Sequence, residues 1–264
     1  MSGRSFTRTS AALVALSLFA GGRALASPSP LRVAAAADLA LAFKDVGAAY
    51  EKKTGDKVIF SFGSTGLLQK QIVEGAPFDL FAAANVSFAE EAIKAGACSA
   101  DSKTLYARGR IVMWWRKEGG VAPPKDLADL ADKRFVKVAI ANPAHAPYGQ
   151  AAQQAMGKVG IWPLVKPKLV FGENVQQTLQ FAQSGNAEIA IVALSLAVIN
   201  DGSFQLVPDE LHGAIDQALV VCGKQPERTR AAHAFTAYVD SPAGRAIMKR
   251  YGFLLPGEFL SKVN

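Results

Sequence analysis

Cysteine and histidine are scarce in this chain of 264 residues, which has two of the first and three of the second. The histidines, His145, His212 and His233, share no spacing that matches a zinc site. Cys98 and Cys222 stand far apart in the sequence, and two cysteines cannot define a disulfide framework. An oxidising compartment would allow them to pair. They are equally compatible with two separate small apolar residues.

Catalytic and nucleotide-binding motifs are also missing. The run Gly63-Ser64-Thr65-Gly66 lacks the Gly-x-Ser-x-Gly elbow of a nucleophile, and no histidine follows in a triad context. No phosphate-binding loop ends in Gly-Lys-Ser/Thr, and no Gly-x-Gly-x-x-Gly follows an apolar run. We therefore expect neither an enzyme nor a resident cofactor. No dense Lys/Arg run is interleaved with aromatic residues, so we expect no nucleic-acid partner.

The first 26 residues are typical of an export signal. Arg4 and Arg8 make a basic start, an apolar run of about ten residues follows, and Ala24-Leu25-Ala26 supplies small residues for cleavage. No later stretch reaches the roughly 20 apolar residues that a transmembrane helix needs. The mature protein is therefore expected to be soluble. No cysteine stands at the cleavage position, so we expect a periplasmic protein without a lipid anchor. The alternative is a cytoplasmic protein with an apolar N-terminus.

Cleavage of that signal would remove three arginines and lower the formal net charge from +7 to +4. A mild positive charge suits an anion-binding protein, although it does not identify one.

Beyond residue 30, short apolar runs alternate with amphipathic stretches of helical length. This rhythm predicts an α/β protein with parallel or mixed sheets covered by helices. The expected strands are residues 31–36, 57–62, 80–84, 110–115, 136–141, 168–171, 189–192 and 217–221. The expected helices are residues 39–53, 66–74, 88–95, 149–159, 175–184, 226–240 and 242–251. A new section begins near residue 110. We predict one lobe from residues 27–109 plus about 223–264, and a second lobe from about 110–222.

Four junctions between an expected strand and an expected helix have small polar or glycine residues where the helix begins. They are residues 36–39, 62–66, 142–149 and 172–175. The first amides of a helix have no partner and carry the positive end of its dipole, so they can bind an oxyanion without a cation. Ser64, Thr65 and Tyr148 would add hydroxyl donors. Such residues are also ordinary helix caps. Their recurrence at the same end of successive strands predicts a ligand site there.

Six segments recur in the order and spacing of a known family across nearly all of the mature chain. They are residues 33–39, 61–66, 75–81, 142–149, 172–175 and 250–253. Together they resemble the periplasmic molybdate-binding protein family. The resemblance implies a type II periplasmic-binding fold, with two lobes of mixed sheets flanked by helices that close around the ligand. It implies a small oxyanion, molybdate or tungstate, that the protein delivers to an inner-membrane ABC permease. We expect a monomer.

Carried over position by position, the resemblance implies four contacts made by uncharged donors, with no free metal cation. The residues are Ala37 and Asp38 at the first contact, Ser64 and Thr65 at the second, Tyr148 at the third, and the Val175 backbone amide at the fourth. Relatives with a tyrosine on the later strand would have it at Ala193, which has no hydroxyl, and Tyr148 would take that role. The alternatives are a packing role near the hinge for Tyr148 and a core position for Val175.

Asp38 departs from the family pattern, because many members carry Ser, Thr or Asn there. A carboxylate facing a dianion in a dry site would cost several kcal/mol. Our hypothesis is that Asp38 caps the helix with its side chain turned away and offers only its backbone N–H. The competing hypothesis is a different ligand class, such as a solute with donors of its own.

Two further functions are compatible with the same fold. One is a sensory or enzyme-like descendant that no longer serves transport, since a fold does not determine a function. The other is binding of a different oxyanion or a small carboxylate. The sequence does not separate molybdate from tungstate.

Overall fold

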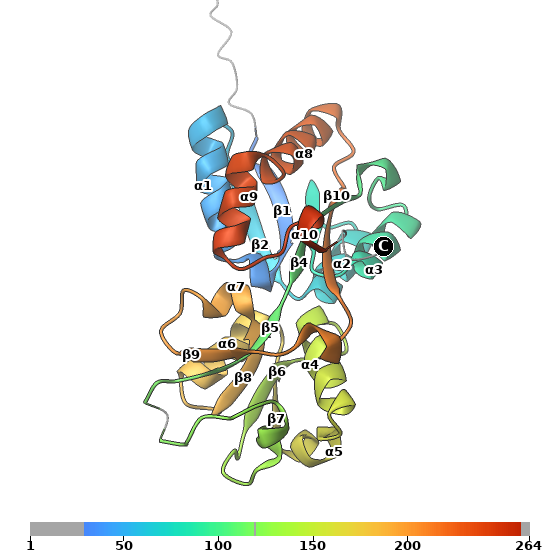
Figure 1. Ribbon diagram of the computed structural model, residues 1–264. Helices are drawn as coiled ribbons and strands as arrows, with labels where there is room; N and C mark the ends of the chain where they lie inside the picture. The colour runs from blue at the N-terminus through green and yellow to red at the C-terminus, as the bar shows by residue number, and fades with distance from the viewer. Residues whose placement is uncertain (1–28, 119, 260–264) are drawn as a thin grey trace, which may run out of the picture.

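The computed structural model describes residues 29–118 and 120–259 (Figure 1). The predicted export signal lies outside the described residues. The described chain forms two lobes, each built on a five-stranded mixed sheet with helices packed against it (Figure 1). The predicted two-lobed α/β fold is therefore confirmed.

The first lobe contains a sheet with the strand order β2-β1-β3-β10-β4. Its strands are β1 (Leu31–Ala36), β2 (Val58–Gly63), β3 (Leu80–Ala83), β4 (Thr104–Gly109) and β10 (Ile215–Val221). Strand β1 is parallel to β2 and β3, and β10 is antiparallel to β3 and β4. The carboxyl ends of β1, β2 and β3 therefore meet at one edge of the sheet.

Helices cover both faces of this sheet. One face is covered by α1 (Ala42–Thr54), α8 (Pro226–Val239) and α9 (Pro242–Arg250). The other face is covered by α2 (Thr65–Val73) and α3 (Val86–Lys94). The short helix α10 (Pro256–Phe259) lies beside β4. Alternate side chains of β1 pack on opposite faces of the sheet. Val33 and Ala35 belong to the main core, and Ala34 belongs to the smaller core with Leu68 and Phe81. Burial on both faces explains why β1 is apolar throughout.

The second lobe repeats this plan with the order β7-β6-β8-β5-β9. Its strands are β5 (Ile111–Trp115), β6 (Val138–Ala141), β7 (Leu169–Gly172), β8 (Ile189–Ala193) and β9 (Ser203–Leu206). Its helices are α4 (Pro147–Lys158), α5 (Trp162–Val165), α6 (Val175–Gln183) and α7 (Leu194–Ala197). Strand β6 is parallel to β7 and β8, so their carboxyl ends also share one edge.

Within the described residues, the chain crosses between the lobes twice. Strand β4 ends at Gly109 and β5 begins at Ile111 in the other sheet, so Arg110 alone separates them. The return crossing lies between Leu206, the end of β9, and Ile215, the start of β10. The bounds of the two lobes stay a prediction, with one difference. Strand β10 lies in the first sheet, although its residues fall in the range predicted for the second lobe. Its insertion between β3 and β4 depends on distant strands that no local pattern reveals.

Several boundaries differ from those predicted. Strand β4 was not expected. Helix α1 begins at Ala42 instead of residue 39, because the 3-10 turn η1 (Ala37–Leu39) precedes it. Helix α4 begins at Pro147 instead of residue 149. Other 3-10 turns are η2 (Ala100–Ser102), η3 (Ala128–Ala131), η4 (Lys166–Lys168) and η5 (Asp209–Leu211).

Cys98 and Cys222 form a disulfide, which answers the question that the sequence left open. No helix in the described part of the chain has the length and apolarity of a membrane span.

Candidate functional site

A small cavity lies where the two lobes meet, at the carboxyl ends of the parallel strands. The first lobe contributes Ala36, Ala37, Asp38, Gly63, Ser64, Thr65 and Ala84, and the second contributes Ala146, Pro147, Tyr148, Asn174 and Val175. The structure therefore brings all six predicted site residues to one cavity, and their contact with a ligand stays a prediction. The cavity volume is about 10 Å³. A volume this small holds about one water molecule, so a tetrahedral oxyanion enters only if the walls of the cavity move apart, and a sugar or a peptide is excluded in this conformation.

Three helices begin at the wall of this cavity. The first residue of α2 is Thr65, that of α4 is Pro147 and that of α6 is Val175, and all three line the cavity. Each helix therefore directs the positive end of its dipole at the same small space. The side chain of Asn174 accepts from the amides of Gln176 and Gln177, each at 3.0 Å. This cap does not use the amide of Val175.

Ser64 joins the two lobes through His145. Its Oγ lies 2.7 Å from the carbonyl oxygen of His145 and 2.8 Å from Nδ1 of the same residue. The amide of Gly66 donates to the same carbonyl at 3.0 Å. Burial lowers the pKa of His145 below 6.5, which favours the neutral ring. The single hydroxyl proton of Ser64 is thus used within the interface, whichever of the two acceptors it takes.

Thr65 is in a different position from Ser64. It is 1% exposed, and its Oγ1 accepts a hydrogen bond from the amide of Ala84 at 3.3 Å. Because Oγ1 acts as the acceptor in that bond, its own proton can be donated to a ligand. The structure therefore favours Thr65 over Ser64 as the hydroxyl donor from this junction.

Asp38 occupies the centre of a buried polar network. Its Oδ2 accepts hydrogen bonds from the hydroxyl of Tyr148 at 2.9 Å and from Nε2 of Gln217 at 2.6 Å, and Gln217 in turn accepts from the hydroxyl of Tyr106 at 2.7 Å. The other oxygen, Oδ1, is buried without a partner. The part of the hypothesis that makes Asp38 a helix cap is wrong, while the offer of its backbone N–H to a ligand stays a prediction. Its side chain makes no cap, because polar groups of both lobes hold it in the interface.

The network changes the acidity of its members. Burial raises the pKa of Asp38 from 3.8 to about 6, and the hydrogen bonds from Gln217 and Tyr148 oppose part of that rise. Burial also raises the pKa of Tyr148 well above 10, and the nearby Asp38 charge adds to the effect. Tyr148 is therefore a hydroxyl donor at neutral pH. In this conformation its proton goes to Asp38.

Two residues of the site, Gln217 and Ser195, were not predicted from the sequence. Gln217 lies 179 residues from Asp38 in sequence, and Ser195, whose hydroxyl donates to the backbone carbonyl of Asp38 at 2.7 Å, lies 157 residues away. Neither stands in a junction with a recognisable spacing. The one available signal for Gln217 was a polar side chain inside the apolar strand β10, where it is 0% exposed.

The match to a family model decides the class of protein. The model for bacterial extracellular solute-binding proteins matches residues 31–254. The chain belongs to this family. The suspected resemblance is thereby confirmed at the level of the family.

Named relatives of this solute-binding protein are similar over most of their length. The molybdate-binding protein ModA of Azotobacter vinelandii is 39% identical, covering 86% of this chain and 91% of that protein. Its counterpart from Rhodobacter capsulatus is 34% identical, covering 92% and 96%. The solved Azotobacter vinelandii periplasmic molybdate-binding protein superposes with a TM-score of 0.77 at 29% identity, covering 86% of this chain and 99% of that one.

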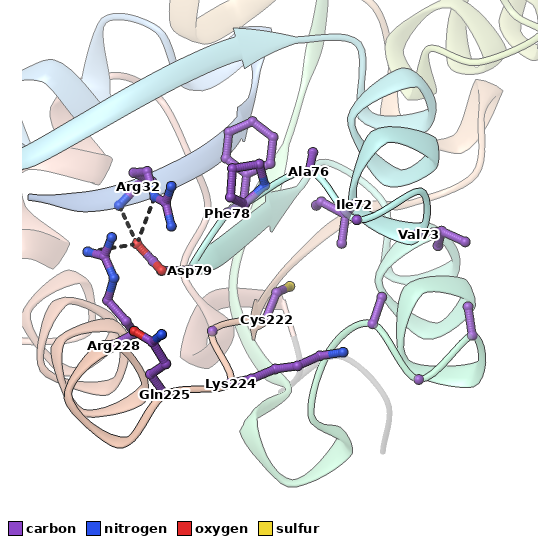
Figure 2. Close-up of a pocket in the computed structure, with 16 residues that line it drawn as sticks. Arg32, Ile72, Val73, Ala76, Phe78, Asp79, Cys222, Lys224, Gln225 and Arg228 are labelled. Atoms are coloured by element: carbon purple, nitrogen blue, oxygen red, sulfur yellow. Dashed lines mark hydrogen bonds and ion pairs between the residues drawn. The ribbon is translucent and has the colours of Figure 1, made fainter.

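A larger groove in the solute-binding protein lies away from the lobe interface, at the opposite edge of the first sheet. It has a volume of about 590 Å³, and Figure 2 shows Arg32, Arg228 and Lys224 at its wall. The buried Asp79 accepts from the amide of Arg32 at 2.8 Å, and its Oδ2 lies 3.6 Å from the Arg32 guanidinium and 3.5 Å from that of Arg228. The two guanidinium groups are thus already paired. This cluster ties the start of β1 to the start of β3.

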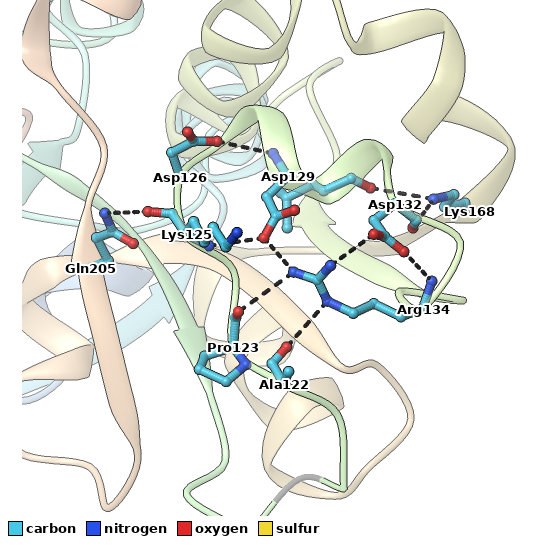
Figure 3. Close-up of polar contacts among 10 residues, drawn as sticks. Ala122, Pro123, Lys125, Asp126, Asp129, Asp132, Arg134, Lys168 and Gln205 are labelled. Carbon is cyan, nitrogen blue, oxygen red and sulfur yellow. Dashed lines mark hydrogen bonds and ion pairs between the residues drawn. The ribbon is translucent and has the colours of Figure 1, made fainter.

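A second polar cluster stabilises the second lobe. Arg134 is paired with Asp129 and Asp132, and Nζ of Lys168 donates to three backbone carbonyls of the same turn, including that of Asp132 at 2.7 Å (Figure 3). These contacts tie a long connection to β7 and leave little binding capacity for a solute. No three His, Cys, Asp or Glu side chains gather as a cation site anywhere in residues 29–118 and 120–259.

Proposed function

We propose that this protein captures molybdate or tungstate in the periplasm and delivers the anion to an inner-membrane ABC permease. It acts as a monomer without a lipid anchor and catalyses no reaction. The ligand lies in the cavity between the lobes. Its oxygens accept hydrogen bonds from the amides at the starts of α2 and α6 and from the hydroxyl of Thr65. Tyr148 and the backbone at Ala37 and Asp38 complete the cage.

One observation carries this proposal: three helix starts from two lobes border one cavity that has no Lys or Arg in its wall. Fixed amide dipoles bind an oxyanion strongly in a dry site, because they need no reorganisation and bring no competing counter-ion. Selectivity then depends on the size of the cage and on the directions of its donors. The names of the relatives support molybdate as the occupant.

Calorimetric titration of the purified mature protein tests the proposal. Molybdate, tungstate, sulfate and phosphate are titrated separately at the same pH. We expect saturable binding of molybdate and tungstate with one site per chain, and much weaker binding of sulfate, which is smaller and would contact fewer donors at once. Size-exclusion chromatography of the same samples is expected to give a monomer. Saturation by sulfate or phosphate, with no heat from molybdate or tungstate, would contradict the proposal.

A second candidate ligand is a hydrogen-bearing oxyanion such as monohydrogen phosphate. The observation that favours it is Asp38, a residue of the cavity wall whose Oδ1 has no hydrogen-bond partner and is available as an acceptor that a cage of donors alone lacks. The phosphate arm of the titration distinguishes the two candidates. Tight binding of phosphate at pH 8, where Asp38 is ionised, would favour the second.

A further inference from the structure

The carboxyl of Asp38 is placed where an anion-binding site least tolerates a negative charge. The residue is 0% exposed, lines the cavity between the lobes, and has one oxygen, Oδ1, that is buried without a hydrogen-bond partner. None of the ion pairs among residues 29–118 and 120–259 includes it. Its other oxygen accepts from two neutral donors, Tyr148 and Gln217.

Every element packed around this carboxyl presents neutral groups to it. Tyr148 comes from α4 and Gln217 from β10, while Tyr106 on β4 contacts Gln217 behind them. From α7, Ser195 donates to the Asp38 backbone, and the start of α6 and the end of β2 contribute Val175 and Gly63 to the same cavity. The two tyrosines are the only titratable groups among these contacts, and burial keeps both protonated by raising their pKa values.

A dianion bound in this cavity would share the same few donors with the carboxylate. Two like charges so close to each other, with little water between them, repel each other strongly. Among the described residues, neither the wall of this cavity nor any ion pair brings a cation to Asp38. A proton on Oδ1 removes the repulsion and also turns an orphaned acceptor into a donor, so one event satisfies both groups.

We propose that this site binds each doubly charged oxyanion together with one proton, which resides on Oδ1 of Asp38 and is donated to an oxygen of the anion. The proposal rests on the proposed function, because it names how the same cavity accepts that ligand. The ionised carboxyl takes up one proton from solvent when the dianion binds. The resulting carboxylic acid forms a hydrogen bond to the dianion. Opening of the lobes releases both.

This coupling makes capture dependent on pH in a defined direction. Above the pKa of free Asp38, which is about 6, the proton must be taken from solvent, and the dissociation constant rises by up to tenfold per pH unit. Below that pKa the proton is already present, and the affinity changes little. Oxyanion capture is therefore strongest in mildly acidic surroundings.

The test is calorimetry of the mature protein with molybdate and tungstate from about pH 6 to about pH 8. It is repeated at one alkaline pH in buffers with different ionisation enthalpies, which gives the number of protons taken up. We expect about one proton per ligand at the alkaline end and a loss of affinity of about fiftyfold across the range. The Asp38→Asn variant has an amide donor in place of the acid, so we expect it to bind without proton uptake and with little dependence on pH.

Asp101→Asn, an identical chemical change at an exposed position of the same lobe, is the matched control and should behave as wild type. If wild type binds molybdate without taking up a proton, or if Asp38→Asn keeps the wild-type pH dependence, the proton-coupling proposal is wrong and the proposed function stands. If neither protein binds molybdate or tungstate at any pH, both the proton-coupling proposal and the proposed function are wrong. The proton count on wild type decides the matter even if the variant fails to fold.

Discussion

Two adjacent residues at the start of α2, Ser64 and Thr65, differ in whether their hydroxyl protons are already used in hydrogen bonds within the protein. The hydroxyl of Ser64 is engaged with His145 across the lobe interface, whereas Thr65 accepts from the amide of Ala84 and keeps its own proton. Sequence alone treats the two as equivalent capping residues. From their distinct partners we propose distinct roles, in which Ser64 joins the lobes and Thr65 contacts the ligand.

Thr65→Val tests this assignment. The change removes the hydroxyl but keeps the shape, so we expect molybdate binding to weaken by about 1 kcal/mol, which is roughly fivefold. Thr54→Val, at the solvent-exposed end of α1, is the control and should leave the affinity unchanged. Calorimetric titration measures both. An unchanged affinity in Thr65→Val would remove this hydroxyl from the cage.

Asp38 also predicts how stability depends on pH. Its pKa is raised from 3.8 to about 6 in the folded protein, so the native state holds the proton more tightly than the unfolded state does. This contribution to stability is present below pH 3.8 and is lost as the pH rises through about 6; its full size is about 3 kcal/mol. Asp38→Asn should therefore unfold at higher urea concentration than wild type at pH 8, with a much smaller difference near pH 4. An equal difference at both pH values would contradict this.

At the scale of elements, the crossing strand β4 and helix α4 fit together tightly at the hinge. A Cβ atom built on Gly109, the last residue of β4, would lie 2.0 Å from the hydroxyl of Tyr148 and 3.2 Å from Nε2 of Gln217. The absence of a side chain at this position is thus what allows Tyr148 to reach Asp38. The strand end and the first turn of the helix act as one unit.

Gly109→Ala should displace the Tyr148 hydroxyl. We expect the free energy of unfolding to fall by about 1–3 kcal/mol, because the added methyl group has no space, and molybdate affinity to fall with it. Gly157→Ala in the same helix α4 is the matched control, since nothing lies within 4 Å of its added Cβ. That control should be neutral or slightly stabilising. Equal stability and affinity for the two variants would show that the contact with Tyr148 is unimportant.

Local signals account for the parts of this fold that sequence reasoning could predict. The strand-to-helix junctions were found because a run of apolar residues, a small polar residue and a helical pattern lie next to one another in the chain. The start of α4 was placed two residues late, because Pro147 occupies the first helical position, where proline is well tolerated. Strand β4 was missed because its residues Thr104–Gly109 include polar side chains on a partly exposed strand.

The polar partners of Asp38 could not be predicted in the same way. Tyr148 was expected to face the ligand, and its bond to Asp38 spans 110 residues of sequence. Gln217 and Ser195 come from elements still further along the chain. Their meeting depends on two crossings between the lobes and on the insertion of β10 into the first sheet. Only the assembled fold determines these contacts.

At the scale of the whole molecule, the lobes are joined by the groups that surround the cavity. Ser64 and Gly66 of the first lobe contact His145 of the second, while Tyr148 and Ser195 of the second contact Asp38 of the first. The contacts that join the lobes in this conformation are therefore also the contacts that arrange the site. A ligand that fits the cage stabilises the closed form through its differential affinity for that form.

The disulfide stabilises the molecule at a different place. Cys98 and Cys222 are separated by 124 residues, so the bond closes a loop that contains the entire second sheet, and Cys222 lines the groove beside Arg32 instead of the cavity between the lobes. The double variant Cys98→Ala and Cys222→Ala should lower the free energy of unfolding by about 2–5 kcal/mol. Its molybdate affinity should stay within twofold of wild type when measured below the lowered melting temperature. A large loss of affinity in the folded variant would show that the bond acts on the site.

A crystal structure of the mature protein with molybdate would show where the anion is bound. We expect the anion between the lobes, with its oxygens within hydrogen-bond distance of the amide of Val175 and the hydroxyl of Thr65, and with no Lys or Arg side chain in contact. Molybdate bound instead in the groove of Arg32 and Arg228, or held between the lobes by a cationic side chain, would contradict this expectation.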